Sequence, residues 1–302
     1  MPFTLSHAAA VLPLIRRDGS GRGRWVPSLL VAGSFAPDVT YFAASAVPGA
    51  MRFGEVTHSF WGVVTVDVPI ALALVGLWRL VAGPLAGLLP ARLRGRTGAP
   101  AGRARTGIRP GALLWWYLSA ALGALTHVVW DAFTHLDRWG MRVLPVLGEK
   151  VAGSPLYWYA QYGGSALALG VLGVFLWRAL RAVPGGAAPD AASPADRRIA
   201  LLLIGGCTAG CAALRIARWL AYVDGAGLEW QPWEIIPTLC FGAGAGLALG
   251  TVLYATVHRV RGRRTSGSGG AGAGRDGAGY DGAGHDGGAG PGGPAPRTAD
   301  TA

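Results

Sequence analysis

The sequence predicts an all-α, multi-pass transmembrane helical bundle of about 5–6 spans, with a short N-terminal helix and a disordered C-terminal tail. Three observations predict this class. First, 51% of the 302 residues are apolar and only 14% are charged, whereas a soluble domain has about 25% charged residues. Second, several apolar runs are long enough to cross a bilayer. Third, the arginines lie in the gaps between these runs, which is typical of membrane topology rather than nucleic-acid binding, so no nucleic-acid partner is expected.

Five apolar runs can cross the hydrocarbon layer, which takes roughly 20 residues. They are residues 60–82, 111–134, 157–180, 199–223 and 235–258. A shorter run, 27–47, is interrupted by Pro37 and Asp38. The first 15 residues are predicted to form an apolar helix that is too short to span alone. We therefore expect one polytopic membrane domain over residues 1–261.

The distribution of arginine predicts the topology. Arginines are concentrated in segments 16–24, 83–110 and 181–198 and after Val257, and by the positive-inside rule these segments are cytoplasmic. The segments expected to face outward are 48–59, 135–156 and 224–234. This pattern predicts a multi-pass protein of the cell (inner or plasma) membrane with a cytoplasmic C-terminus. Loop 83–110 is expected to be flexible, and the Gly/Ala-rich segment 262–302 is expected to be a disordered tail, because it lacks large apolar residues.

The stretch THVVWDAFTH places three ionisable residues at the end of an apolar run. His127, Asp131 and His135 follow one another at steps of four residues, so on a helix they share one face. Such a face is either a polar seam inside the bundle or a set of metal ligands. An HxxxD pair alone is more often an internal hydrogen bond than a metal site.

Further ionisable residues are expected at the same membrane depth, near the outer surface. They are His7, Asp38 and His58, each from a different segment. Ionisable side chains in apolar spans are costly and persist when they are paired, face a cavity or have a function. Imidazole and carboxylate together suit a divalent metal, Zn²⁺ first, with Mn²⁺ or Fe²⁺ as alternatives.

The predicted metal ligands are His7, Asp38, His58, His127, Asp131 and His135. They could hold one metal with carboxylates in an outer layer, or two metals about 3.5–4 Å apart. Taken singly, Asp38 could instead cap a helix after Pro37, and His135 could be an interfacial residue that reaches water.

Four motifs carry a family resemblance: MPFTLSH, GSFAPD, THSFWG and ALGALTHVVWDAFTH. In this order they resemble the bacterial multi-pass proteins of domain of unknown function 4184. That group is similar to the wider YdjM-like (domain 457) inner-membrane, metal-dependent hydrolases. The resemblance covers roughly residues 1–180. This sequence has PDV where the wider family often has PDxD, so a second acid for a two-metal site is missing there.

Carried over position by position, the resemblance implies the ligand set His7, Asp38, His58, His127 and Asp131, and His135 belongs to the TH ending of the last motif. It implies a metal-dependent hydrolase. At the outer membrane interface, a lipid or a phosphoester is the expected substrate, with Asp131 or Asp38 as ligand or general base.

Two arginines in LRIARWL, Arg215 and Arg218, are expected to bind substrate, because guanidinium groups match phosphate oxygens. The alternative for this pair is a salt bridge to Asp67 or to acids of the outer loops, or contact with interfacial water.

Two other classes of function stay open. The His/Asp set could be a structural polar core, a metal store or an ion path in a non-catalytic membrane protein. Alternatively, the basic loops could bind anionic lipid or a cytoplasmic partner, making the protein a membrane scaffold. The pattern does not choose between an enzyme and these alternatives, and it does not indicate an oligomeric state.

Overall fold

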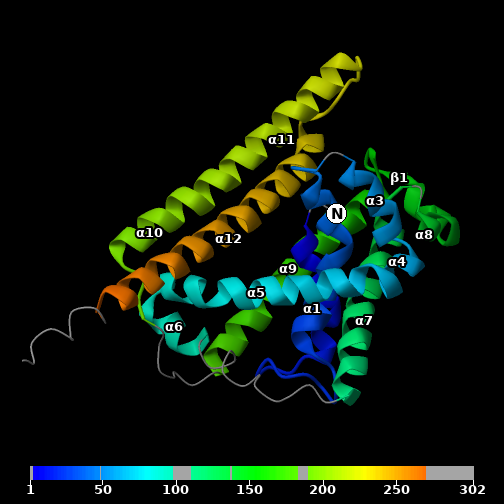
Figure 1. Cartoon of the computed structure of the whole chain (residues 1–302). Helices are drawn as coiled ribbons and strands as arrows, with labels where there is room; N and C mark the ends of the chain where they lie inside the picture. Colours follow the sequence, from blue (N-terminus) through cyan, green and yellow to red (C-terminus); the bar gives the residue numbers. More distant parts are fainter. Residues whose placement is uncertain (1–2, 48, 98–109, 137, 183–189, 270–302) are drawn as a thin grey trace, which may run out of the picture. The chain divides into compact units, whose positions relative to one another are not determined.

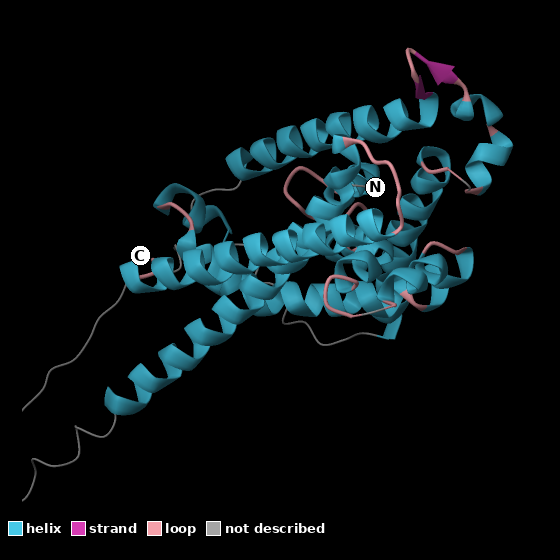
Figure 2. Ribbon diagram, turned by 90° about the horizontal axis from the view of Figure 1, so that it is seen from above, coloured by secondary structure: helices cyan, strands magenta, loops and turns pink. Residues whose placement is uncertain are grey.

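The computed structural model describes residues 3–47, 49–97, 110–136, 138–182 and 190–269 (Figure 1). Residues Met1–Arg259 form one compact unit and Val260–Ala302 form a second. The described residues are mainly helical, and two short strands are the only strands among them (Figure 2). The predicted all-α bundle is confirmed.

Short helices make up the N-terminal part of the chain. They are η1 (Thr4–Leu14, a 3₁₀ helix), α1 (Pro27–Phe35), η2 (Ala36–Asp38, a 3₁₀ turn), α2 (Val39–Ala43), α3 (Ala50–Thr57) and α4 (Phe60–Thr65). The predicted interruption of run 27–47 is present as the 3₁₀ turn η2, because Pro37 has no N–H to donate to the carbonyl four residues earlier. Asp38 therefore ends a tight turn between two helices, and its side chain is fully buried.

Five longer helical segments are long and apolar enough to cross a membrane. They are α5 (Asp67–Leu88), α7 (Pro110–Thr134), α9 (Leu156–Ala182), the continuous series α10 (Pro194–Ala200), η4 (Leu201–Gly205) and α11 (Gly206–Gly225), and α12 (Ile235–Gly269). The predicted run 60–82 is two helices, α4 and α5. Pro69 explains the break, because a proline cannot donate to the carbonyl four residues earlier, here that of Thr65, and its ring clashes with it.

The remaining elements are small. They are α6 (Ala91–Thr97), α8 (Trp139–Val143), η3 (Pro145–Gly148), the hairpin strands β1 (Lys150–Val151) and β2 (Ser154–Pro155), and η5 (Pro232–Glu234). Helix is present where a flexible loop was expected to begin at residue 83, since leucine, alanine and arginine all favour helix there. α12 likewise continues past residue 261. The rest of that predicted loop, 98–109, and of the predicted tail, 270–302, lies outside the described residues.

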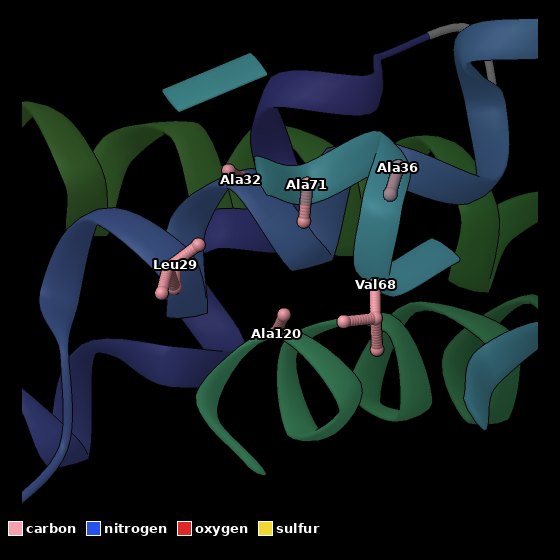
Figure 3. Packing of buried hydrophobic residues seen from close by; sticks show 6 residues of the cluster. All are labelled: Leu29, Ala32, Ala36, Val68, Ala71 and Ala120. Carbon is pink, nitrogen blue, oxygen red and sulfur yellow. The ribbon is translucent and has the colours of Figure 1, made fainter. Parts of the chain in front are cut away.

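Helices α1, α5 and α7 pack closely through small side chains (Figure 3). The buried cluster consists of Leu29, Ala32, Ala36, Val68, Ala71 and Ala120. A Cβ atom on Gly33 would lie 2.2 Å from the carbonyl oxygen of Ala120, and one on Gly123 would lie 2.2 Å from that of Leu30. Small residues thus let the backbones of α1 and α7 touch. This close approach brings Asp38, just after α1, beside the second half of α7.

Helix α12 packs on α11 and η4 through glycines spaced four residues apart. A Cβ atom on Gly246 would lie 2.1 Å from the carbonyl oxygen of Cys207, and one on Gly250 would lie 2.5 Å from that of Leu203. Near its start, α12 also reaches the N-terminal helices, because the ring of Phe241 contacts that of Phe42 at a centroid distance of 5.1 Å. The first turns of α12 therefore help to enclose the region described next.

Candidate metal centre

His127 and Asp131 lie one turn apart on α7, as their four-residue spacing predicts. Nε2 of His127 is 3.4 Å from Oδ2 of Asp131. The His127 side chain is 0% exposed and that of Asp131 is 5% exposed. A polar pair this deep in an apolar helix has a large desolvation cost, so it needs partners from other elements.

Asp38 is the first such partner. Its Oδ1 atom lies 3.5 Å from Nε2 of His127. Its other oxygen, Oδ2, accepts a hydrogen bond of 2.5 Å from the hydroxyl of Thr4 in η1. The carboxylate is therefore oriented by the N-terminal helix, with one oxygen left to face the imidazole.

His58 is the second partner and caps the C-terminus of α3. Its Nε2 atom is 3.5 Å from Oδ1 of Asp38 and 3.6 Å from Oδ2 of Asp131. The short helices α3 and α4 diverge at this point, where Ser59 caps α4 by accepting a hydrogen bond from the N–H of Gly62. The turn between the two helices thus positions the imidazole.

Backbone carbonyls determine the tautomer of both imidazoles. Nδ1 of His127 lies 2.8 Å from the oxygen of Ser34, and Nδ1 of His58 lies 2.9 Å from that of Gly54. A carbonyl can only accept, so each Nδ1 carries a proton and donates it. Both carbonyls belong to the last turn of a helix, and that of Gly54 also accepts a hydrogen bond from the N–H of His58. Each Nε2 atom is consequently unprotonated and points toward the carboxylates of Asp38 and Asp131. Metal-bound histidines are held in the same way, by an outer hydrogen bond from the other ring nitrogen.

Four of the six separations among these atoms match the edges of a tetrahedral metal site. Asp38, His58, His127 and Asp131 each offer one ligand atom, and the four atoms lie within 4.8 Å of one another. A tetrahedron with metal–ligand bonds of about 2.1 Å has edges of about 3.4 Å, against about 3.0 Å for neighbouring positions of an octahedron. The four measured imidazole–carboxylate distances are 3.4 to 3.6 Å, close to the tetrahedral value.

Some atoms facing the centre make no hydrogen bond. Within the part of the chain that the structure describes, no hydrogen-bond partner is present for Nε2 of His58, Nε2 of His127 or Oδ1 of Asp38. Buried polar atoms are normally satisfied, and an exception calls for an explanation such as an ion. These three residues and Asp131 form what we call the His/Asp cluster, which could hold a divalent metal ion.

His7 lies beside the His/Asp cluster. Its ring stacks on that of His127, with centroids 3.6 Å apart and an interplanar angle of 13°. Its Nε2 atom is 3.5 Å from Oδ1 of Asp131. The two oxygens of Asp131 therefore face different imidazoles. The structure places His7 next to the four converging atoms but not among them.

His135 lies at the edge of the cluster, one turn beyond Asp131. Its Nδ1 atom is 3.7 Å from Oδ2 of Asp131 and 3.2 Å from the carbonyl oxygen of the same residue. Its Nε2 atom is 3.2 Å from the amide nitrogen of Gln161 on α9. The side chain is 29% exposed. Thus His135 is also outside the four converging atoms.

His58 and His135, which lie outside the long helices, both have shifted pKa values. Burial opposes a charge on His58, but the carboxylates of Asp131 and Asp38 outweigh it and raise the pKa of His58 above the ordinary 6.5. Burial lowers the pKa of His135 to about 4. A proton and a metal ion therefore compete for Nε2 of His58, whereas His135 is neutral at physiological pH.

A pocket of about 450 Å³ adjoins the cluster. Its lining includes Tyr41, Asp131, His135, Arg138, Gln161 and Phe241. Asp131 belongs to both the cluster and the pocket, so it joins the two. A small molecule in this pocket would contact the cluster through the side of Asp131.

Arg215 and Arg218 lie near this region but bind backbone. Nη1 of Arg215 donates to the carbonyl oxygen of Tyr41 and to the hydroxyl of Ser45, both at 2.8 Å. Nη1 of Arg218 donates to the carbonyl oxygen of Ser45 at 3.2 Å. The alternative salt bridge to Asp67 is not formed between the described residues, since both oxygens of Asp67 are buried without a hydrogen-bond partner there. In this arrangement the two arginines hold the end of α2.

Residues that the motifs did not indicate also shape the site. The ring of Tyr41 stacks on that of His58 at a centroid distance of 5.1 Å and meets the edge of Phe241 at 5.5 Å. Arg138 lines the same pocket as Tyr41, and its positive charge acts on the Tyr41 hydroxyl. The only available signals were that Tyr41 follows Asp38, and Arg138 follows His135, by three residues. Such a spacing does not by itself indicate a role.

Comparison with known protein families matches residues 1–256 to the domain of unknown function DUF4184. No curated protein and no solved structure matches the chain. The match covers the cluster, the pocket and all five long helical segments except the end of α12. The relation to the YdjM-like hydrolases is not part of this match and stays a prediction. This protein belongs to the family of domain of unknown function 4184.

Proposed function

We propose that this protein is a divalent-metal-dependent hydrolase that acts on a lipid or phosphoester at the outer interface of the cell membrane. One observation carries the proposal. Four ligand atoms that lie within 4.8 Å of one another adjoin a pocket of about 450 Å³ through Asp131. Metal-assisted hydrolysis needs water and substrate to reach the metal, and a catalytic zinc keeps one coordination position open, so Asp131, on the pocket side, is the ligand position that water can share.

The donor set favours Zn²⁺. Two imidazoles and two carboxylates suit zinc, and the four imidazole–carboxylate separations of 3.4 to 3.6 Å match edges of its preferred tetrahedron. Mn²⁺ and Fe²⁺ remain alternatives and would require the four side chains to move closer together. A bound divalent ion supplies a Lewis acid and makes a nearby water more acidic.

The residues of the cluster differ in access to the pocket. Asp38 is fully buried and held by Thr4, which suits a ligand. Asp131 lines the pocket, so it is the carboxylate that can also accept a proton from a reacting water. His135 lines the pocket as a neutral imidazole and can assist in the same transfer.

The surface next to the pocket supports a membrane-interfacial site. α3 and α4 expose the large apolar side chains Met51, Phe53, Val56, Phe60 and Trp61. Short helices with such faces lie in the interface of a bilayer. The arginine-rich segments belong to the opposite ends of the long helices, which supports an outward-facing site and a cytoplasmic C-terminus.

Hydrolysis assays on the full chain in detergent test this proposal. The substrates are p-nitrophenyl phosphate, bis-p-nitrophenyl phosphate and dioctanoyl phosphatidic acid. We expect zinc-dependent turnover, a loss of at least about 100-fold in Asp131→Asn, and no change in Glu149→Gln, which removes an exposed carboxylate outside the pocket. Two outcomes contradict the proposal. One is a turnover rate that is the same in Asp131→Asn as in wild type, and the other is no turnover by the fully zinc-loaded protein.

A second candidate is a structural polar core in a non-catalytic protein. It is favoured by the deep burial of the cluster, whose four side chains are at most 5% exposed. Protonated His58 or His127 could then balance the two carboxylates as ion pairs without a metal. This reading predicts that the purified protein contains no bound metal and that replacing His127 impairs folding.

A further inference from the structure

The pocket beside the His/Asp cluster has one polar and one apolar side. The polar side chains include Arg138 and Gln161, while Met51, Pro237 and Phe241 contribute apolar surface. Small-molecule sites generally combine an apolar lining with a few polar groups that orient the ligand. A ligand with both polar and apolar parts would complement this surface.

Arg138 is the one arginine that lines the pocket within the described parts of the chain. It is half-buried and precedes α8. Its interaction is with the Tyr41 side chain, and no ion pair joins it to a carboxylate of the described residues. By contrast, Arg215 and Arg218 donate to backbone oxygens nearby. The guanidinium of Arg138 is thus the one best placed to receive an anion.

The neighbours of Arg138 place it on the cluster side of the pocket. Tyr41, which it contacts, stacks on His58 of the cluster. Glu55 also lines the pocket but is exposed to solvent, where its repulsion of an anion is screened. An anion at Arg138 would therefore lie near the cluster, and Gln161, which contacts His135, can donate a further hydrogen bond.

We propose that this pocket binds the phosphate group of a phosphate-bearing lipid, with Arg138 as the residue that selects it. A guanidinium can donate two parallel hydrogen bonds to phosphate oxygens. The exposed apolar side chain of Met51 on α3 lines the same pocket and suits the lipid's chains. The inference rests on the proposed function for the role of the metal, but binding itself can be tested without turnover.

The test measures binding by the zinc-loaded full chain in detergent, using isothermal titration calorimetry. The probes are dioctanoyl phosphatidic acid, dioctanoylglycerol and inorganic phosphate. The variant is Arg138→Gln, and its matched control is Arg142→Gln, an exposed arginine on α8 outside the pocket lining. Zinc content and thermal midpoint are recorded for each protein.

We expect Arg138→Gln to weaken phosphatidic acid binding about 10- to 100-fold, the usual effect of losing a charged hydrogen-bond partner. Arg142→Gln should bind within about twofold of wild type, since exposed surface changes matter little. Binding of dioctanoylglycerol should be weak and indifferent to Arg138→Gln. If Arg138→Gln fails to fold, Arg138→Lys replaces it and should show a smaller but measurable loss, because lysine cannot form the bidentate pair.

Several results would overturn the inference. They are no binding of phosphatidic acid to wild type, equal binding by Arg138→Gln, loss of zinc in Arg138→Gln, or inorganic phosphate binding as tightly as phosphatidic acid. The last result would identify free phosphate as the ligand. Arg138-dependent binding without hydrolysis would uphold this site and count against the hydrolase. Hydrolysis that is unaffected by Arg138→Gln would support the hydrolase and count against Arg138 as the phosphate-binding residue.

Discussion

The imidazole rings of His7 and His127 stack face to face, with centroids 3.6 Å apart and planes inclined by 13°. Residues three apart on a 3₁₀ helix project to the same side, so η1 also directs Thr4 toward the cluster, where its hydroxyl binds Asp38. One face of the N-terminal helix therefore covers the His/Asp cluster. This relationship leads to the first two predictions.

Replacing His7 should weaken metal binding without abolishing it. In His7→Ala the Asp131 carboxylate loses its neighbour at 3.5 Å, while the four converging atoms remain. We expect a 10- to 100-fold lower zinc affinity, the usual cost of losing an outer-layer partner of a metal site. Competition with a fluorescent chelator measures it, with His258→Ala on α12 as control. Complete loss of zinc would instead make His7 a ligand.

Removing the Thr4 hydroxyl should release one oxygen of Asp38. Thr4→Val keeps the shape of the side chain but loses the 2.5 Å hydrogen bond. We expect roughly tenfold weaker zinc binding, and recovery in Thr4→Ser. Thr65→Val, which removes an exposed hydroxyl bonded to its own helix, is the matched control. Equal affinities in Thr4→Val and wild type would show that this contact does not orient Asp38.

Adding a methyl group at Gly54 should disturb the stack that supports His58. A Cβ atom there would lie 2.3 Å from the ring of Tyr41, whereas one on Gly76 would meet nothing within 4 Å. We expect Gly54→Ala to lower stability by about 1–3 kcal/mol through overpacking and to weaken zinc binding. Gly76→Ala should be neutral or stabilising, since alanine favours helix. Thermal unfolding in detergent compares the two, and equal midpoints would contradict this packing.

Removing the metal should destabilise the folded protein. A ligand that binds only the folded state stabilises it by about 2.7 kcal/mol when present at 100 times its dissociation constant. We therefore expect a chelator to lower the thermal midpoint of wild type and leave that of His58→Ala unchanged. A midpoint of wild type that does not respond to chelation and zinc readdition would contradict a metal in this cluster.

The helical elements follow from local sequence, and so does part of the site. Long apolar runs predict the five long helical segments, and the four-residue spacing predicts the shared face of His127 and Asp131. Pro37 predicts the interruption of the helix after α1, which places Asp38 beside α7. The division between α4 and α5 was missed because the apolar run continues through it, although Pro69 provides the physical cause.

Contacts between distant residues account for what the sequence could not predict. Thr4 meets Asp38 across 34 positions, and Gln161 meets His135 across 26. Neither pair has a spacing that indicates a contact. The hydrogen bonds of Arg215 reach across 174 positions to Tyr41. The position of Arg215 in an apolar run makes it a phosphate-binding candidate, but only the fold shows which oxygens surround it.

Metal analysis of the purified full chain tests the central claim most directly. Four proteins are loaded with zinc and separated from unbound metal: wild type, His58→Ala, His127→Ala and the control His258→Ala. The zinc content of each is then measured by inductively coupled plasma mass spectrometry. We predict about one zinc ion per chain in wild type and His258→Ala, and none in His58→Ala and His127→Ala. Wild type without bound metal, or zinc retained in both cluster variants, would contradict the account.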